Sequence, residues 1–178
     1  MTLPSRRLVL AALSVALVGA CAPAATYTAM VPDMPPGMAP APAYRNAITV
    51  GSVTLGRDVG TPWTSAVGPD QVQQALVQTL AGAGLGQPTN GRFRLDGQLL
   101  TLSRPYAGFA MTVTAAIAWR LTDTTSGAVV YDRTLQGLGT ATLDDAVDNT
   151  NRLRIADQRA IRANLQQVVQ DLYALPPR

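Results

Sequence analysis

Cys21 has the most distinctive chemistry in this chain of 178 residues, because it is the only cysteine and histidine is absent. A lone thiol could serve as a nucleophile, a metal ligand, half of a disulfide or a site of covalent modification. A Cys-His nucleophile, a Ser-His-Asp triad and a zinc site of nitrogen and sulfur ligands all need imidazole or further thiols. None of these arrangements can be assembled within one chain.

The charged residues restrict the chemistry further, because all 14 basic residues are Arg and all 11 acidic residues are Asp. Without Lys there is no phosphate-loop lysine and no Schiff base. Acid-base chemistry would rest on Asp, Tyr, Ser and Thr, so a hydrolase or transferase built on Asp and Tyr is our third hypothesis. We predict that the protein is not an enzyme and has no cofactor.

Three aspartates, Asp144, Asp145 and Asp148, form the densest carboxylate cluster in the sequence. Carboxylate oxygens are ligands that suit Ca²⁺, but the alternating positions and central glycine of a calcium loop are missing. Asp and Asn also favour turns and helix starts. We therefore predict a turn here and no metal site.

The residues before Cys21 have the composition of an export signal. Two arginines, Arg6 and Arg7, precede the run LVLAALSVALV, and small residues follow it. A helix of eleven residues is about 17 Å long, too short for a hydrocarbon core of about 30 Å. Residues 1–20 are thus predicted to be a signal peptide. The arginine pair also resembles a twin-arginine export motif, so the export route stays open.

The residues Val18-Gly19-Ala20-Cys21 resemble the lipobox of bacterial lipoproteins. This resemblance implies cleavage between Ala20 and Cys21 and acylation of Cys21 by several chains, which would anchor the protein in a membrane. Ala22, rather than Asp, resembles lipoproteins that are sent to the outer membrane. The mature chain would carry 12 Arg against 11 Asp, scattered among one another, and a nucleic-acid partner is not expected.

Residues 21–45 are predicted to be the lipidated cysteine and a disordered Pro/Ala-rich tether, because six prolines interrupt any apolar period. Residues 46–178 are predicted to form a single periplasmic domain. Apolar alternation predicts strands at 47–55, 92–102, 111–121 and 128–138, with a bulge near Gly97. Amphipathic periodicity predicts helices at 68–86 and 152–175. The order β-α-β-β-β-α predicts an α+β fold, with two helices on one face of an antiparallel sheet.

Two predicted loops carry aromatic residues. Trp63 lies in the loop after the first strand, and Tyr106 and Phe109 lie between the second and third strands. If both loops meet at one end of the sheet, they would form an aromatic patch for a peptide or lipid, since exposed aromatic residues are common at binding hot spots. The alternative interpretation is that Trp63 packs over the end of the core.

The stretches TPWTSAV, GFAMTVTAAIAWRL and RLRIADQRAIRANL resemble a family of small, uncharacterised outer-membrane lipoproteins of proteobacteria. That family implies no catalytic residues. The resemblance favours a non-catalytic adaptor or assembly factor on the periplasmic face of the outer membrane, working with an envelope complex. The alternative is a binding module for lipid or peptide that uses the aromatic loops. Fold analogy alone does not decide between them.

Overall fold

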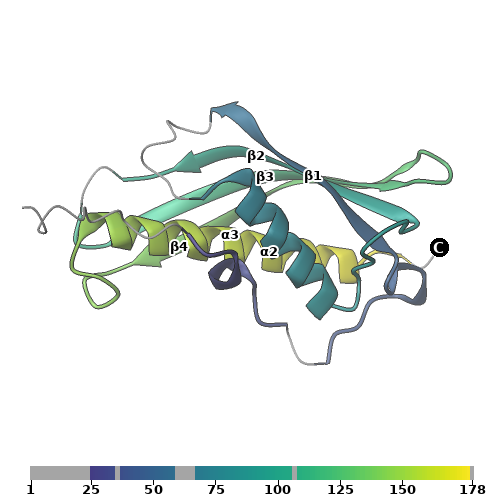
Figure 1. The fold of residues 1–178 in the computed structure, drawn as a ribbon, viewed down its shortest axis with the longest axis horizontal. Helices are drawn as coiled ribbons and strands as arrows, with labels where there is room; N and C mark the ends of the chain where they lie inside the picture. Colours follow the sequence, from purple (N-terminus) through teal and green to yellow (C-terminus); the bar gives the residue numbers. More distant parts are fainter. Residues whose placement is uncertain (1–24, 35–36, 59–66, 106–107, 177–178) are drawn as a thin grey trace, which may run out of the picture.

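The computed structural model describes residues 25–34, 37–58, 67–105 and 108–176. A four-stranded sheet forms one layer, and two helices form the other layer on a single face of it (Figure 1). The elements in chain order are β1 (Ile48–Asp58), α2 (Pro69–Gly82), β2 (Phe93–Ser103), β3 (Met111–Asp123), β4 (Val129–Ala141) and α3 (Asn149–Tyr173). Two short 3₁₀ turns, η1 (Tyr27–Met30) and η2 (Pro42–Tyr44), precede them. The predicted α+β class and the β-α-β-β-β-α order are confirmed.

One strand pairing differs from the predicted antiparallel sheet. The strand order is β1-β2-β3-β4, and the β2–β3 and β3–β4 pairs are antiparallel, whereas β1 and β2 are parallel. The cause is the connection through α2, whose 14 residues span about 21 Å and carry the chain back along β1 before β2 begins. Gly84 follows the C-terminal end of α2 with a φ of 66°, a conformation that glycine adopts without strain.

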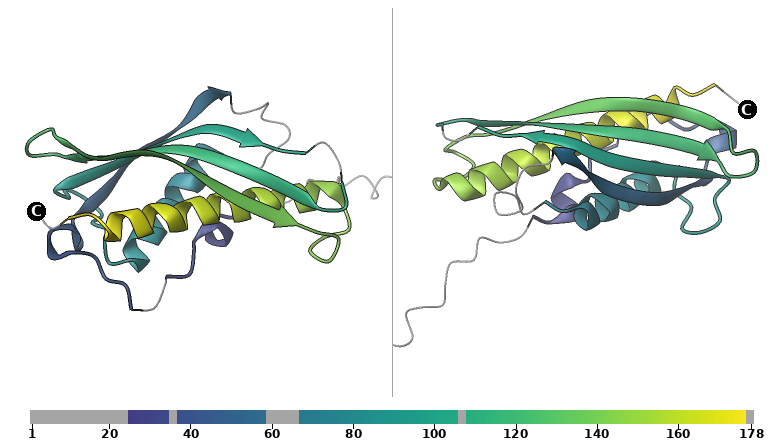
Figure 2. Two further views of the ribbon diagram at one scale, coloured as in Figure 1. Left: turned by 180° about the vertical axis from the view of Figure 1, so that it is seen from behind. Right: turned by 90° about the horizontal axis from the view of Figure 1, so that it is seen from above.

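The alternating pattern of β3 sets the two faces of the sheet. One set of side chains is buried against the helices, from Met111 through Val113 and on to Leu121. The opposite set, which includes Thr112 and Arg120, faces outwards. Figure 2 shows that both helices of the described residues, α2 and α3, lie on the inner face and leave the outer face uncovered by them. The core therefore lies between the inner face of the sheet and the two helices.

A buried polar contact fixes α3 on the sheet. The Asn164 side chain is fully buried, accepts a hydrogen bond from Trp119 Nε1 at 2.8 Å, and donates to the carbonyl oxygens of Ala115 at 3.2 Å and Leu135 at 2.8 Å. All of its polar atoms are thus paired, as burial requires. Gly139 lets the helix backbone approach β4, because a Cβ there would lie 2.8 Å from the Arg159 carbonyl carbon and still closer to Ala156 and Ala160.

The irregularity predicted near Gly97 lies in the pairing with β1, where the register shifts between Val50 and Val53, opposite Leu95 and Gly97. A second irregularity lies farther along β2. The register between β2 and β3 shifts between Leu99 and Thr101. Gly97 pairs regularly with Trp119, and a Cβ at Gly97 would lie 3.0 Å from Cε3 of that indole. Glycine at this position therefore makes room for a large buried ring.

The described part of the predicted tether packs against the domain, which corrects the prediction of disorder for residues 25–34 and 37–45. Met30 and Tyr44 are completely buried, and Ala25 is 5 % exposed. The turn η1 contacts both α2 and α3, and the Tyr44 ring packs on Phe93 with 4.9 Å between centroids. Proline removes helical periodicity but does not prevent single apolar side chains from reaching the core. The prediction of disorder relied on the absence of an apolar period, so it missed these side chains.

Candidate functional site: the loop end of the sheet

Three chain connections leave the sheet at the same end. Because β1 and β2 are parallel, their last residues lie together, and Asp58 pairs with Thr101 close to the end of β2. The first residue of β3, Met111, pairs with the last residue of β4, Ala141. The connections after β1, β2 and β4 therefore start from one end of the domain. Of the residues proposed from sequence, Ala20, Cys21, Trp63 and Tyr106 lie outside the described residues.

Phe109 lies at this end and is 84 % exposed. It precedes the Met111–Ala141 pair by two residues, and Leu143, 46 % exposed, follows that pair by two residues. Val147, just before the first turn of α3, is 86 % exposed. We call Phe109, Leu143 and Val147 the apolar loop end. Large apolar side chains that are exposed at one end of a domain are candidates for an interaction site.

Sequence reasoning found Phe109 but missed Leu143 and Val147. Both are single apolar residues within an Asp-rich segment, and such residues carry no periodic signal. The only sign in the sequence that they are exposed is their position as single apolar residues in a polar turn. A buried residue is usually part of a helix or strand whose period places it on the inner face.

A buried ion pair connects the residues after β2 to helix α3 near the apolar loop end. Arg104 follows β2, and its Nε donates to both carboxylate oxygens of Asp157 in α3, at 2.9 and 3.2 Å. The Asp157 side chain is fully buried, and that of Arg104 is 9 % exposed. A buried pair of this kind fixes geometry more than it adds stability, because desolvation offsets much of the attraction. It ties the start of the β2–β3 connection to the helix layer.

Two of the three aspartates of the β4–α3 connection, Asp145 and Asp148, have structural partners. Asp145 accepts hydrogen bonds from both terminal nitrogens of Arg159, at 2.6 and 2.8 Å, and from the Thr142 amide at 2.9 Å. The Arg159 hydrogen bonds, followed by the Thr142 amide, lower the pKa of Asp145 to about 2. Asp148 caps α3 by accepting from the Asn151 amide at 2.8 Å, which also lowers its pKa. These contacts account for the predicted turn and helix start.

Within the described ranges, no cluster of three carboxylate or cysteine side chains could hold a metal ion. The two buried aspartates of these ranges, Asp123 and Asp157, do not converge either. Asp123 ends β3 at the opposite end of the sheet and binds Arg92 and the turn amides of Thr125 and Ser126. This arrangement offers no carboxylate pair for acid-base chemistry.

The Tyr131 hydroxyl donates to Asp171 Oδ2 at 2.7 Å, joining β4 to the end of α3. Desolvation, followed by the hydrogen bond to Asp171, raises the pKa of Tyr131 above its ordinary value. A tyrosine that acts as a nucleophile or base would need the opposite shift. The contact is therefore structural, and it does not favour the hypothesis of an Asp/Tyr enzyme.

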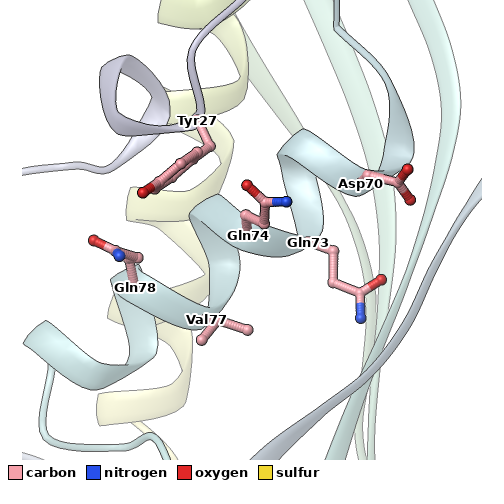
Figure 3. A pocket seen from close by; sticks show the side chains of 6 residues that line it. All are labelled: Tyr27, Asp70, Gln73, Gln74, Val77 and Gln78. Atoms are coloured by element: carbon pink, nitrogen blue, oxygen red, sulfur yellow. The ribbon is translucent and has the colours of Figure 1, made fainter.

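A shallow groove lies on the helix side of the domain, between η1 and α2. It has a volume of about 550 Å³ and is lined by Tyr27, Asp70, Gln73, Gln74, Val77 and Gln78. Figure 3 shows the Tyr27 ring beside the α2 side chains Gln74 and Gln78. Three of its six lining residues are glutamines. No helix in the described part of the chain is long and apolar enough to cross a membrane.

The fold defines a class of small α+β proteins, and solved bacterial structures share it. A Xanthomonas campestris protein of the family DUF330 is 15 % identical, with a TM-score of 0.56 and coverage of 81 % of this chain and 93 % of that one. A hypothetical protein from Chlamydia trachomatis is 9 % identical, with a TM-score of 0.54 and coverage of 71 % and 97 %.

The fold is also similar to that of PelC from Paraburkholderia phytofirmans, a dodecamer, at 18 % identity and a TM-score of 0.52, with coverage of 74 % of this chain and 91 % of that one. No family model and no curated protein matches the sequence. At these identities the similarity is one of fold.

Proposed function

We propose that this protein is a lipoprotein of the bacterial outer membrane that faces the periplasm and acts as a non-catalytic adaptor or assembly factor for an envelope complex. Acylated Cys21 would supply the membrane anchor, and the apolar loop end would bind the partner protein. The export signal and the lipobox-like VGAC support the first part of the proposal.

The exposure of Phe109 carries the second part. At 84 % exposure this ring lies on the surface rather than in a pocket, and Val147 at the same end is equally open. An exposed apolar surface favours a protein partner over a small lipid, because a lipid-binding site encloses its ligand. The binding of a lipid or an isolated peptide remains the second candidate function.

Affinity purification of the native acylated protein from membranes tests the proposal. We expect the wild-type protein to recover a stoichiometric envelope complex, and the double variant Phe109→Ser/Val147→Ser to lose it. Val129→Ser is the matched control, because Val129 is 50 % exposed at the opposite end of β4. Recovery of the protein alone, with bound lipid, would contradict the adaptor function. Equal losses in both variants would exclude the loop end as the binding surface.

The anchor has its own test. Cys21→Ser removes the acylated sulfur, so we expect this variant to leave the membrane fraction. If it stays membrane-bound, the proposed attachment is wrong. Because PelC is a dodecamer, light scattering on the detergent-solubilised protein would show whether the partner at the loop end is another copy of this chain.

A further inference from the structure

The distance between the lipid anchor and the folded domain is short. Ala25 is 5 % exposed and belongs to the hydrophobic core cluster, as does the fully buried Met30. Only four residue steps separate Ala25 from Cys21. At about 3.3–3.6 Å per residue, a fully extended chain covers at most about 14 Å.

The part of the domain nearest the anchor is η1, which contacts α2 and α3. Figure 1 shows η1 beside α2 and below α3, so that α3 lies between η1 and the sheet. Since a helix with its side chains is about 10 Å thick, the outer face of the sheet is more than about 10 Å farther from the anchor than η1 is. A spacer of about 14 Å therefore restricts which face of the domain can lie against the membrane.

The side chains around η1 suit the polar surface of a bilayer. The groove between η1 and α2 exposes Tyr27 and several glutamine side chains, with Asp70 as its single charged residue. Asp33, beyond η1, is paired with Arg162. Neutral amides exchange hydrogen bonds with lipid headgroups without placing unpaired charge beside the phosphates, and a tyrosine suits the membrane–water interface.

We propose that the face formed by η1 and the exposed side of α2, around Tyr27, Gln74 and Gln78, lies against the lipid headgroups, while the outer face of the sheet points away from the membrane. The orientation rests on the acylation of Cys21 proposed above. It leaves the outer face of the sheet accessible to soluble partners.

Site-specific quenching in vesicles tests this orientation. Acylation consumes the thiol of Cys21, the only native cysteine, so a single added cysteine takes a fluorescent label uniquely. We would label full-length acylated Gln78→Cys on the groove, and Thr134→Cys on the outer face of the sheet, where Thr134 pairs with Ala118. The vesicles would be zwitterionic phosphatidylcholine containing lipid with a nitroxide headgroup.

We expect the label on Gln78→Cys to lose most of its fluorescence and the label on Thr134→Cys to lose almost none. Equal quenching at both positions, or stronger quenching at Thr134→Cys, would overturn the orientation. A flexible Gly/Ser insert of about 20 residues after Ala22 has an end-to-end distance of about 25 Å, and it should abolish the quenching at Gln78→Cys. Persistent quenching would overturn the claim that the short spacer sets the orientation.

The mass of the purified protein separates the two proposals. If Cys21 carries no acyl chains, the membrane attachment and the orientation both fail. If Cys21 is acylated but the two labels are quenched alike, only the orientation fails.

Discussion

Replacing Asn164 by Leu tests how α3 is held on the sheet. Leu has the same branching and number of heavy atoms as Asn but cannot form hydrogen bonds, so it removes the acceptor of Trp119 Nε1 and the donor to two strand carbonyls. A buried donor without a partner costs about 1–3 kcal/mol, and each lost carbonyl bond costs about 0.5–1.5 kcal/mol. Because the buried Leu side chain offsets part of this loss, we expect the free energy of unfolding to fall by about 2–4 kcal/mol.

Urea unfolding followed by far-UV circular dichroism measures this change without depending on indole fluorescence. A double-mutant cycle with Trp119→Phe isolates the bond between the two side chains, because the double variant has neither donor nor acceptor. We expect a coupling of about 1–3 kcal/mol between the two sites. A loss below about 0.5 kcal/mol for Asn164→Leu, or strictly additive single variants, would refute the role assigned to Asn164.

The remaining predictions concern the helix contact and the loop end. Gly139→Ala forces a methyl group against the α3 backbone and should destabilise the protein by about 1–3 kcal/mol in urea unfolding. In the control Gly82→Ala the new Cβ meets open space, so an equal loss there would exclude the steric explanation. The pKa of Asp145 is lowered from its ordinary value of 3.8 to about 2, so its contact with Arg159 stabilises the fold above pH 3.8 and is lost as the pH falls towards 2. The difference in melting temperature between the wild type and Asp145→Asn should therefore shrink over that range, and a difference that stays constant down to pH 2 would contradict the linkage.

Much of the fold follows from local patterns in the sequence. The alternation along residues 111–121 matches the buried and exposed faces of β3, and the apolar spacing from Ile161 to Leu172 matches the buried stripe of α3. Pro69 and Gly84 mark the start and end of the first helical segment, as proline and glycine chemistry predicts. These features can be predicted locally, because the apolar period of a helix or strand and the backbone preferences of proline and glycine depend on only a few neighbouring residues.

The direction of β1 relative to β2 could not be derived in this way. Strand pairing depends on where the α2 connection returns the chain, and no residue within either strand encodes that path. The same pairing places the ends of β1 and β2 together, so it also decides that the connections after β1 and β2 leave from one end of the sheet.

By itself, the sequence determined which chemistries the chain lacks the residues for, and it supplied the single cysteine and the composition that predicts an export signal. Tertiary structure alone decided which residues are exposed together. Leu143 and Val147 join Phe109 at one end because β3 and β4 pair there, and Met30 and Tyr44 enter the core although their segment is rich in proline. The physical reason is that burial depends on contacts between residues far apart in the chain, whereas composition and period report only on neighbours.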